Sequence, residues 1–129
     1  MVNKLHKQII HKRQEAILDL IEQRKDIPRI ERELALLVLD VIDAVTRKSL
    51  SLKEGCGCFT AIDYAIDKKL RADFSQDFFE LLNEAVILDE AGTRYGPNLE
   101  LMTKLAQDIL KRDAELKKSK IKNFVASRA

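Results

Sequence analysis

The sequence predicts an all-α protein, a compact bundle of about five amphipathic helices. Of its 129 residues, 46% are hydrophobic and 34% are charged, a composition typical of an ordered globule with a highly charged surface. Only four Gly and two Pro interrupt the chain and Trp is absent, so intrinsic propensity favours helix over strand. Apolar residues also recur every three or four positions, which is the helical period. We expect a single domain, residues 1–116, followed by a basic tail, residues 117–129.

The first helix is predicted from about residue 3 to residue 25. Its apolar residues share one broad arc of the helix: Leu5, Ile9, Ile10, Ala16, Ile17, Leu20 and Ile21. Asp26 follows the helix and is the expected N-cap of the next one, because an Asp side chain accepts hydrogen bonds from free backbone N–H groups. The first helix is therefore expected to bury one wide face.

The second helix, predicted from Pro28 to about Lys48, is the most apolar segment of the chain. Pro28 suits a first helical turn, where its missing N–H costs nothing. Apolar residues cover more than half of the helix circumference, which predicts a central helix covered on most sides. Its narrow polar face contains two expected ion pairs with helical spacing: Arg29 with Glu33, and Asp43 with Arg47.

The third and fourth helices are predicted from their start signals. Ser51 and Glu54 have the spacing of a capping box, which starts a helix that we expect to continue to about Leu70. A hydrophobic staple then surrounds a second N-cap and starts the fourth helix: Phe74, Ser75 and Phe79. Gly92 is the expected residue just after the end of that helix.

The fifth helix is predicted to start at Asn98, after a break from Gly92 to Pro97, and to reach about Leu116. Beyond it the helical signal weakens, although three apolar residues keep helical spacing among lysines: Ile121, Phe124 and Val125. The tail is interpreted either as a frayed helix or as a segment that becomes ordered only on association.

The two cysteines, Cys56 and Cys58, are too close together in sequence to link distant parts of a fold. On a regular helix their side chains point about 200° apart, which opposes a shared metal ion in one subunit. We interpret them as core or rim thiols, with a thiol pair or an intersubunit metal as the alternative. The neighbouring Gly55 and Gly57 are expected to let another helix approach closely.

The candidate ligand-binding site consists of Asp63, Asp89, Arg94 and Tyr95. Asp63 falls on the edge of the apolar face of the third helix, and Asp89 falls within the apolar face of the fourth. Because a buried carboxylate needs a cation or hydrogen-bond donors, we expect a compensating partner, with Arg94 or the Tyr95 hydroxyl nearest to Asp89 in sequence. An internal salt bridge is the favoured interpretation, and a ligand-binding or catalytic carboxylate site is the alternative.

Charge is unevenly distributed along the chain. Residues 1–29 carry seven basic and four acidic side chains (+3), residues 30–102 carry eight and fourteen (−6), and residues 103–129 carry eight and three (+5). Three interpretations follow: terminal helices fold back on an acidic centre, the ends of one subunit dock on another, or basic arms bind nucleic acid. The first two interpretations, which are structural, are favoured.

Nucleic-acid binding would have to use the basic ends of the chain. The third and fourth helices have the size of a helix-turn-helix unit, but the second of them would present Asp77, Glu80 and Glu84 and repel phosphate. The basic candidates are Lys4, Lys7, Lys12, Arg13, Lys111, Lys117, Lys118, Lys120 and Lys122. No aromatic series is interleaved with them, so a solvated charged surface is the favoured interpretation.

No catalytic residue, cofactor or metal site is predicted. The sequence lacks a phosphate-binding Gly-rich loop, a Ser nucleophile elbow and a dinucleotide fingerprint, and His6 and His11 do not have helical metal-ligand spacing. No apolar run long enough for a membrane span and no signal peptide are found, which predicts a cytoplasmic protein without membrane contact.

The leading hypothesis is a non-enzymatic protein-protein interaction or regulatory module that self-associates as a homo-oligomer. A nucleic-acid-associated accessory protein and a ligand-binding or enzymatic protein are the two alternatives.

Overall fold

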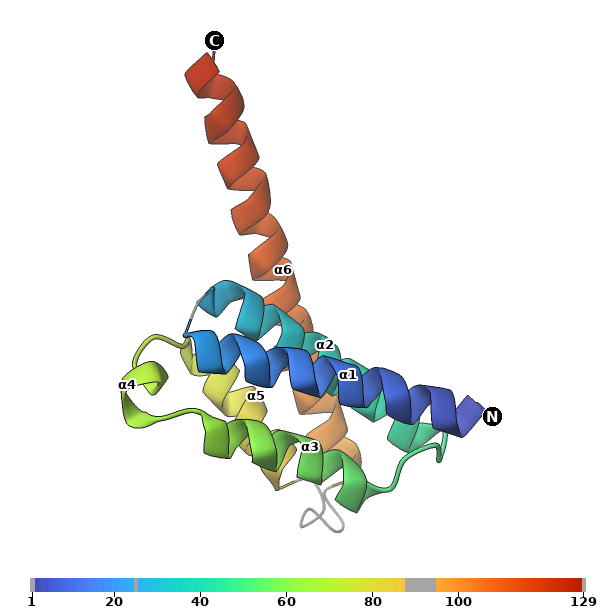
Figure 1. Ribbon diagram of the computed structural model, residues 1–129. Coiled ribbons are helices and arrows are strands. Elements are labelled where there is room, and N and C mark those ends of the chain that lie inside the picture. Colours follow the sequence, from blue (N-terminus) through green and yellow to red (C-terminus); the bar gives the residue numbers. More distant parts are fainter. Residues whose placement is uncertain (1, 25, 88–94, 129) are drawn as a thin grey trace.

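The computed structural model shows an all-α fold, which confirms the predicted class (Figure 1). It describes residues 2–24, 26–87 and 95–128, and the side chains of residues 5–24, 26–87 and 99–118. Six helices and no strand are found in this described part of the chain. Their bounds are α1 Val2–Gln23, α2 Ile27–Thr46, α3 Leu52–Ala65, α4 Lys68–Arg71, α5 Gln76–Val86 and α6 Tyr95–Arg128.

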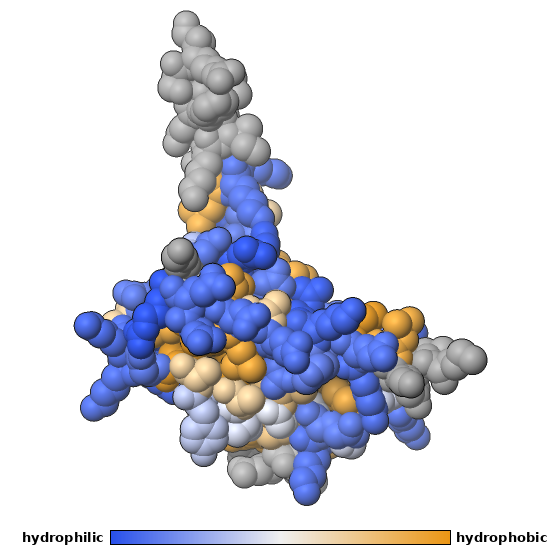
Figure 2. Space-filling view, in the orientation of Figure 1, coloured by the Kyte–Doolittle hydropathy of each residue, from blue (hydrophilic) through white to orange (hydrophobic). Residues whose placement is uncertain are grey.

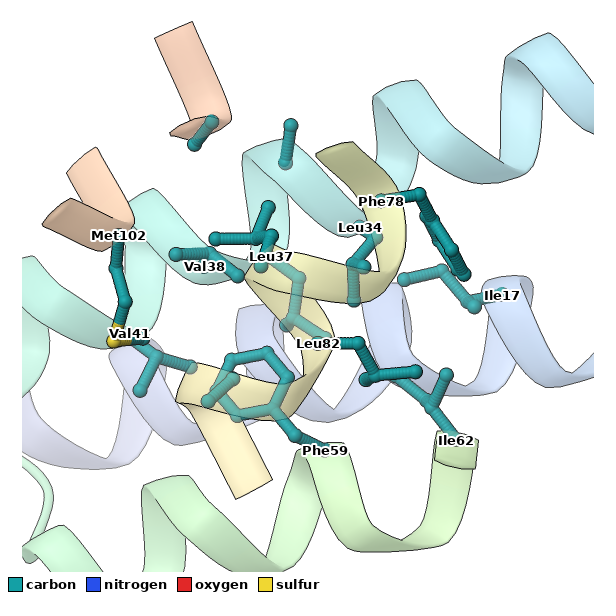
Figure 3. Close-up of a cluster of buried hydrophobic side chains, with 14 of the residues drawn as sticks. Ile17, Leu34, Leu37, Val38, Val41, Phe59, Ile62, Phe78, Leu82 and Met102 are labelled. Carbon is teal, nitrogen blue, oxygen red and sulfur yellow. The ribbon is translucent and has the colours of Figure 1, made fainter. Parts of the chain in front are cut away.

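Helix α2 lies at the centre of the bundle, as predicted, and contacts α1, α3, α5 and α6. Its buried residues are Ile30, Leu34, Ala35, Leu37, Val38, Val41, Ala44 and Val45. Side chains from the surrounding helices close around it (Figure 3), namely Ile17 of α1, Phe59 and Ile62 of α3, Phe78 and Leu82 of α5 and Met102 of α6. These residues form one continuous hydrophobic core.

Local capping signals start three of the helices as predicted. The Asp26 side chain accepts a hydrogen bond from the backbone N–H of Arg29 at 3.4 Å at the start of α2. Ser51 and Glu54 form the reciprocal capping box of α3, with N–O distances of 3.1 and 3.4 Å. At the start of α5, Ser75 Oγ accepts from the Phe78 N–H at 3.3 Å.

The hydrophobic staple at α5 is also present. The rings of Phe74 and Phe79, which precede the N-cap and follow it, meet edge to face with their centroids 5.9 Å apart. This contact fixes the angle at which the chain enters α5, and it confirms the predicted start of the helix.

Two predicted helix ends are wrong. The third helix stops at Ala65 instead of Leu70, because Ile66 turns into an extended conformation and Asp67 starts the short helix α4 by accepting the Leu70 N–H at 2.8 Å. The fourth ends at Val86, not near Gly92, and the Val86 carbonyl accepts a hydrogen bond from Cys56 Sγ at 2.7 Å.

The fifth helix begins at Tyr95 rather than after Asn98, so Pro97 lies in its first turn. The N–H groups of a first turn have no intrahelical partner, and Pro therefore causes no loss there. The predicted break from Gly92 to Pro97 falls partly outside the described residues.

Helix α6 leaves the bundle in its second half. Met102, Leu105 and Ile109 are buried against the core, whereas Leu116 is 52% exposed. Figure 1 shows α6 continuing beyond the other helices to the C-terminal end. We call residues 117–128 the arm. Its backbone is helical, which corresponds to the helical interpretation of the predicted tail.

The two glycines of α3 have different surroundings. A Cβ atom on Gly55 would lie 2.8 Å from Val41 Cγ1, so α3 approaches α2 as closely as predicted at this position. At Gly57 a Cβ atom would meet nothing within 4 Å. The prediction that both glycines allow a close helix approach is therefore right for Gly55 and wrong for Gly57, which faces solvent.

Candidate functional site

Asp63, one of the four predicted site residues, forms an ion pair with Arg71. The Asp63 Oδ1–Arg71 Nη2 distance is 2.9 Å, and the same nitrogen donates to the Asp63 backbone carbonyl at 3.3 Å. Both side chains are partly exposed. Since Asp63 lies in α3 and Arg71 ends α4, the pair holds the turn between these helices. The predicted extension of α3 to Leu70 left no reason to expect this contact.

The other predicted site residues are not placed by the structure. Asp89 and Arg94 lie outside the described residues, and Tyr95 begins α6 with a side chain that is outside them as well. The suggestion that these residues form a ligand-binding site together with Asp63 therefore stays a prediction.

Neither cysteine forms a disulfide, and the two lie in different environments, as expected for core and rim positions. Cys56 is buried, and Cys58 is partly buried next to α1, where its backbone carbonyl accepts from Gln14 Nε2 at 3.3 Å. Burial, together with the negative charge of Glu54, raises the pKa of the Cys58 thiol above its usual value. A raised pKa keeps the thiol protonated and unreactive near neutral pH.

Within the described residues, no three His, Cys, Asp or Glu side chains come together as a group that could hold a metal ion. His11 is exposed, and its Nε2 lies 2.9 Å from Oε1 of Glu15, one helical turn later. No helix in the described part of the chain has the length and apolar content needed to cross a membrane.

A groove of about 620 Å³ runs between α1 and the first half of α2. We call it the α1–α2 groove. Three apolar side chains of α1 line it: Ile9, Ala16 and Leu20. The other lining residues are charged or polar: Lys12, Arg13, Asp19, Gln23, Arg29 and Glu33. Figure 2 shows the molecule from the α1 side, where apolar patches interrupt the hydrophilic surface. The groove is open to solvent, unlike the filled core beneath it.

Two residues that line the α1–α2 groove, Arg13 and Glu33, belong to an ion-pair network that joins the two helices. Arg13 Nη1 lies 2.7 Å from Glu33 Oε2, and Arg13 Nε lies 3.1 Å from Asp40 Oδ2. Arg32 also contacts Glu33, at 3.5 Å. The predicted pair of Arg29 with Glu33 is therefore wrong, because Glu33 turns toward Arg13. The other predicted pair, Asp43 with Arg47, is confirmed at 2.9 Å.

Three charged side chains around the α1–α2 groove, Lys12, Asp19 and Arg29, form no ion pair with any other described residue. Lys12 and Asp19 are two helical turns apart in α1, and both are exposed. The groove thus combines apolar side chains with charges that have no opposite charge beside them in the described part of the chain.

A second polar cluster, which we call the α6 clamp, lies where α6 leaves the bundle. It joins Glu31 of α2, Ser75 at the N-cap of α5, Asp77 of α5 and Arg112 of α6. Ser75 Oγ donates a hydrogen bond to Glu31, and Arg112 Nη1 lies 3.1 Å from Asp77 Oδ2. Arg112 Nη2 also donates to Ser75 Oγ at 3.4 Å. Because it connects three helices at the base of the arm, we expect the clamp to hold the direction of α6.

Comparisons with known proteins find no protein-family model, no curated protein and no solved structure that matches this chain. Its function is therefore inferred from the contacts, charges and exposed surfaces described above.

Proposed function

We propose that this protein is a non-enzymatic protein-protein interaction or regulatory module that self-associates. The observation that carries the proposal is the α1–α2 groove, in which apolar side chains of α1 line an open surface although the core is already filled. Exposed apolar side chains that gather in one groove and have polar residues around them are typical of a protein contact site.

Helix α1 supports this proposal because it has apolar residues on two faces. The inner face is buried against α2 and α3 through Ile10, Ile17 and Ile21. On the outer face Leu5 is 58% exposed and Ile9 is 45% exposed. A surface helix of a monomer needs only one apolar stripe, so the second stripe favours contact with another molecule.

Self-association is tested by sedimentation velocity of the whole chain between about 1 and about 100 µM, a range that covers weak and moderate interfaces. We expect the mass to rise from monomer toward dimer or larger as the concentration increases, because the apolar groove is buried on assembly. A monomer mass over the whole range would contradict the proposal.

The arm favours a second candidate function, contact with nucleic acid. Residues 117–128 contain five basic side chains and no acidic one, and the arm projects from a bundle that contains most of the acidic residues (Figure 1). A helix with this charge attracts phosphate and releases its counterions. Such binding would be electrostatic and largely independent of base sequence.

Salt-dependent binding of the whole chain to duplex DNA and to single-stranded RNA tests this second function. We expect affinity to fall steeply with salt, and the combined substitutions Lys118→Glu, Lys120→Glu and Lys122→Glu to abolish it. The matched control reverses three exposed lysines of α3 and α4: Lys53, Lys68 and Lys69. Equal loss in both triple variants would show a net-charge effect and not an arm, and a flat salt response would exclude the function.

A further inference from the structure

We propose that the α1–α2 groove is filled by α1 of a second copy of this chain, antiparallel to the first α1 about a two-fold axis at Ala16. Lys12 of each copy then faces Asp19 of the other. This inference rests on the proposed self-association and specifies its surface and its geometry.

The outer stripe of α1 has the pattern of a self-complementary surface. Ala16 is exposed, and a small side chain there lets two helices come close. Ile9 precedes it by two turns and Leu20 follows it by one, and both line the α1–α2 groove. An antiparallel second α1 would place its own Ile9 and Leu20 on either side of the Ala16 contact, so the exposed apolar stripe of each copy is covered by the other.

The charges on this stripe select the antiparallel direction. Lys12 lies four residues before Ala16 and Asp19 three residues after it, on the same side of the stripe. A two-fold axis at Ala16 brings Lys12 of one copy to within one residue, about 1.5 Å along the helix, of the level of Asp19 of the other. A cation therefore meets a carboxylate at both ends of the contact. In a parallel pair related by a two-fold axis, the Lys12 and Asp19 side chains of the two copies would lie on opposite sides of the contact. Neither charge would then have the opposite charge of the other copy beside it.

Charge also argues against the arm of a second copy as the occupant of the groove. The arm contains five basic and no acidic residues. In the groove, Arg13 is already paired with Glu33 and Asp40, which leaves Lys12 and Arg29 against the single carboxylate of Asp19. A basic arm would be repelled there, whereas the outer stripe of α1 offers one cation, Lys12, and one carboxylate, Asp19.

Charge reversal with mixing tests the geometry. In the Lys12→Glu protein two carboxylates face each other, and in the Asp19→Lys protein two lysines do, so each homodimer is expected to dissociate about tenfold more readily than the original. When the two variants are mixed in equal amounts, both contacts pair Lys with Asp or Glu with Lys. The mixed dimer should therefore regain the original affinity within about twofold, measured by fluorescence energy transfer between labelled copies.

Lys53→Glu is the matched control, since Lys53 is an exposed lysine of α3, which packs on the other side of α1. We expect its dimer to keep the original affinity. Far-UV circular dichroism of each variant verifies that the fold is retained, as expected for exposed positions.

The possible failures are distinguishable. If the original chain dimerises but single reversals have no effect, or mixing does not restore affinity, the antiparallel contact is wrong and self-association stands. If the original chain is a monomer at every concentration, the contact and the proposed self-association are both wrong.

Discussion

Gly55→Ala is expected to lower the free energy of unfolding by about 1–3 kcal/mol. The added methyl group would lie 2.8 Å from Val41 Cγ1, and it would also contact Val45 and Leu50 at 3.6 and 3.7 Å. Val41 is fully buried and its branched side chain has little rotamer freedom, so relief requires α3 to move away from α2. This loss exceeds the gain in helix propensity that Ala normally provides over Gly.

Gly57→Ala is the matched control in the same helix. Its new methyl group would meet nothing within 4 Å, so only helix propensity changes, and the free energy of unfolding should rise by about 0.5–1 kcal/mol. Urea unfolding of both variants, followed by circular dichroism, measures the two values. Changes of the same sign at both positions would show that the α2–α3 approach at Gly55 is not a close contact.

The elements that the sequence predicts correctly depend on near neighbours in the chain. The capping box needs only Ser51 and Glu54, three residues apart, and the start of α5 needs only Ser75 with the flanking Phe74 and Phe79. Side chains this close in sequence meet whenever the helix begins, whatever surrounds it. The central position of α2 is predictable for a similar reason, because its apolar surface is too wide to be covered from one side.

The errors arise where two possible partners compete. Arg29 is one helical turn from Glu33, but Arg13 reaches the same carboxylate from another helix. The Arg13 side chain is less exposed than that of Arg29. The end of α3 is another case. Asp67 caps α4 through the Leu70 N–H, and Arg24 of the chain segment after α1 also binds Asp67. The hydrogen bond from the Leu70 N–H contributes most, and the one from Arg24 adds to it; together they lower the pKa of Asp67. A continuous helix from residue 52 to residue 70 would lose this cap.

The α1–α2 groove was partly visible in the sequence. Leu5, Ile9, Ala16 and Leu20 share an arc with Ile10, Ile17 and Ile21, but together they span more of α1 than one neighbour can cover. That excess width is the signal for a second contact surface. Which part of the arc faces the core could not be read, because it depends on how α2 and α3 sit beside α1. The spacing of Lys12 and Asp19 suggests an antiparallel contact only when this outer stripe is known to be exposed.

The α6 clamp was not predictable because its members come from three separate helices. Glu31, Ser75 and Arg112 lie far apart in the sequence, and each has an ordinary local role as a helix-surface or cap residue. Only packing of α5 and α6 against α2 brings them together. The Glu31 side chain is only 13% exposed there, so its carboxylate needs the hydrogen bond from Ser75 in place of water.

Ser75→Ala is therefore expected to lower the free energy of unfolding by about 2 kcal/mol, from two losses. The first is the N-cap of α5, since the Phe78 N–H no longer finds Ser75 Oγ. The second is the hydrogen bond to Glu31, which leaves a largely buried carboxylate with a more distant cation, Arg112 Nη2 at 4.0 Å. Chemical unfolding of the purified variant measures the sum.

Ser51→Ala separates the two losses. Ser51 caps α3 in the same way, but it is exposed and its side chain is hydrogen-bonded only to the neighbouring Glu54 N–H among the described contacts. Its replacement should cost about 1 kcal/mol, the value of the cap alone. The difference between the two variants is then the contribution of the α6 clamp, and a double-mutant cycle of Ser75→Ala with Glu31→Ala should recover it as a coupling energy. If Ser75→Ala costs no more than Ser51→Ala and the coupling is zero, the clamp does not stabilise the base of α6, and the direction of the arm is set by the packing of Met102, Leu105 and Ile109 alone.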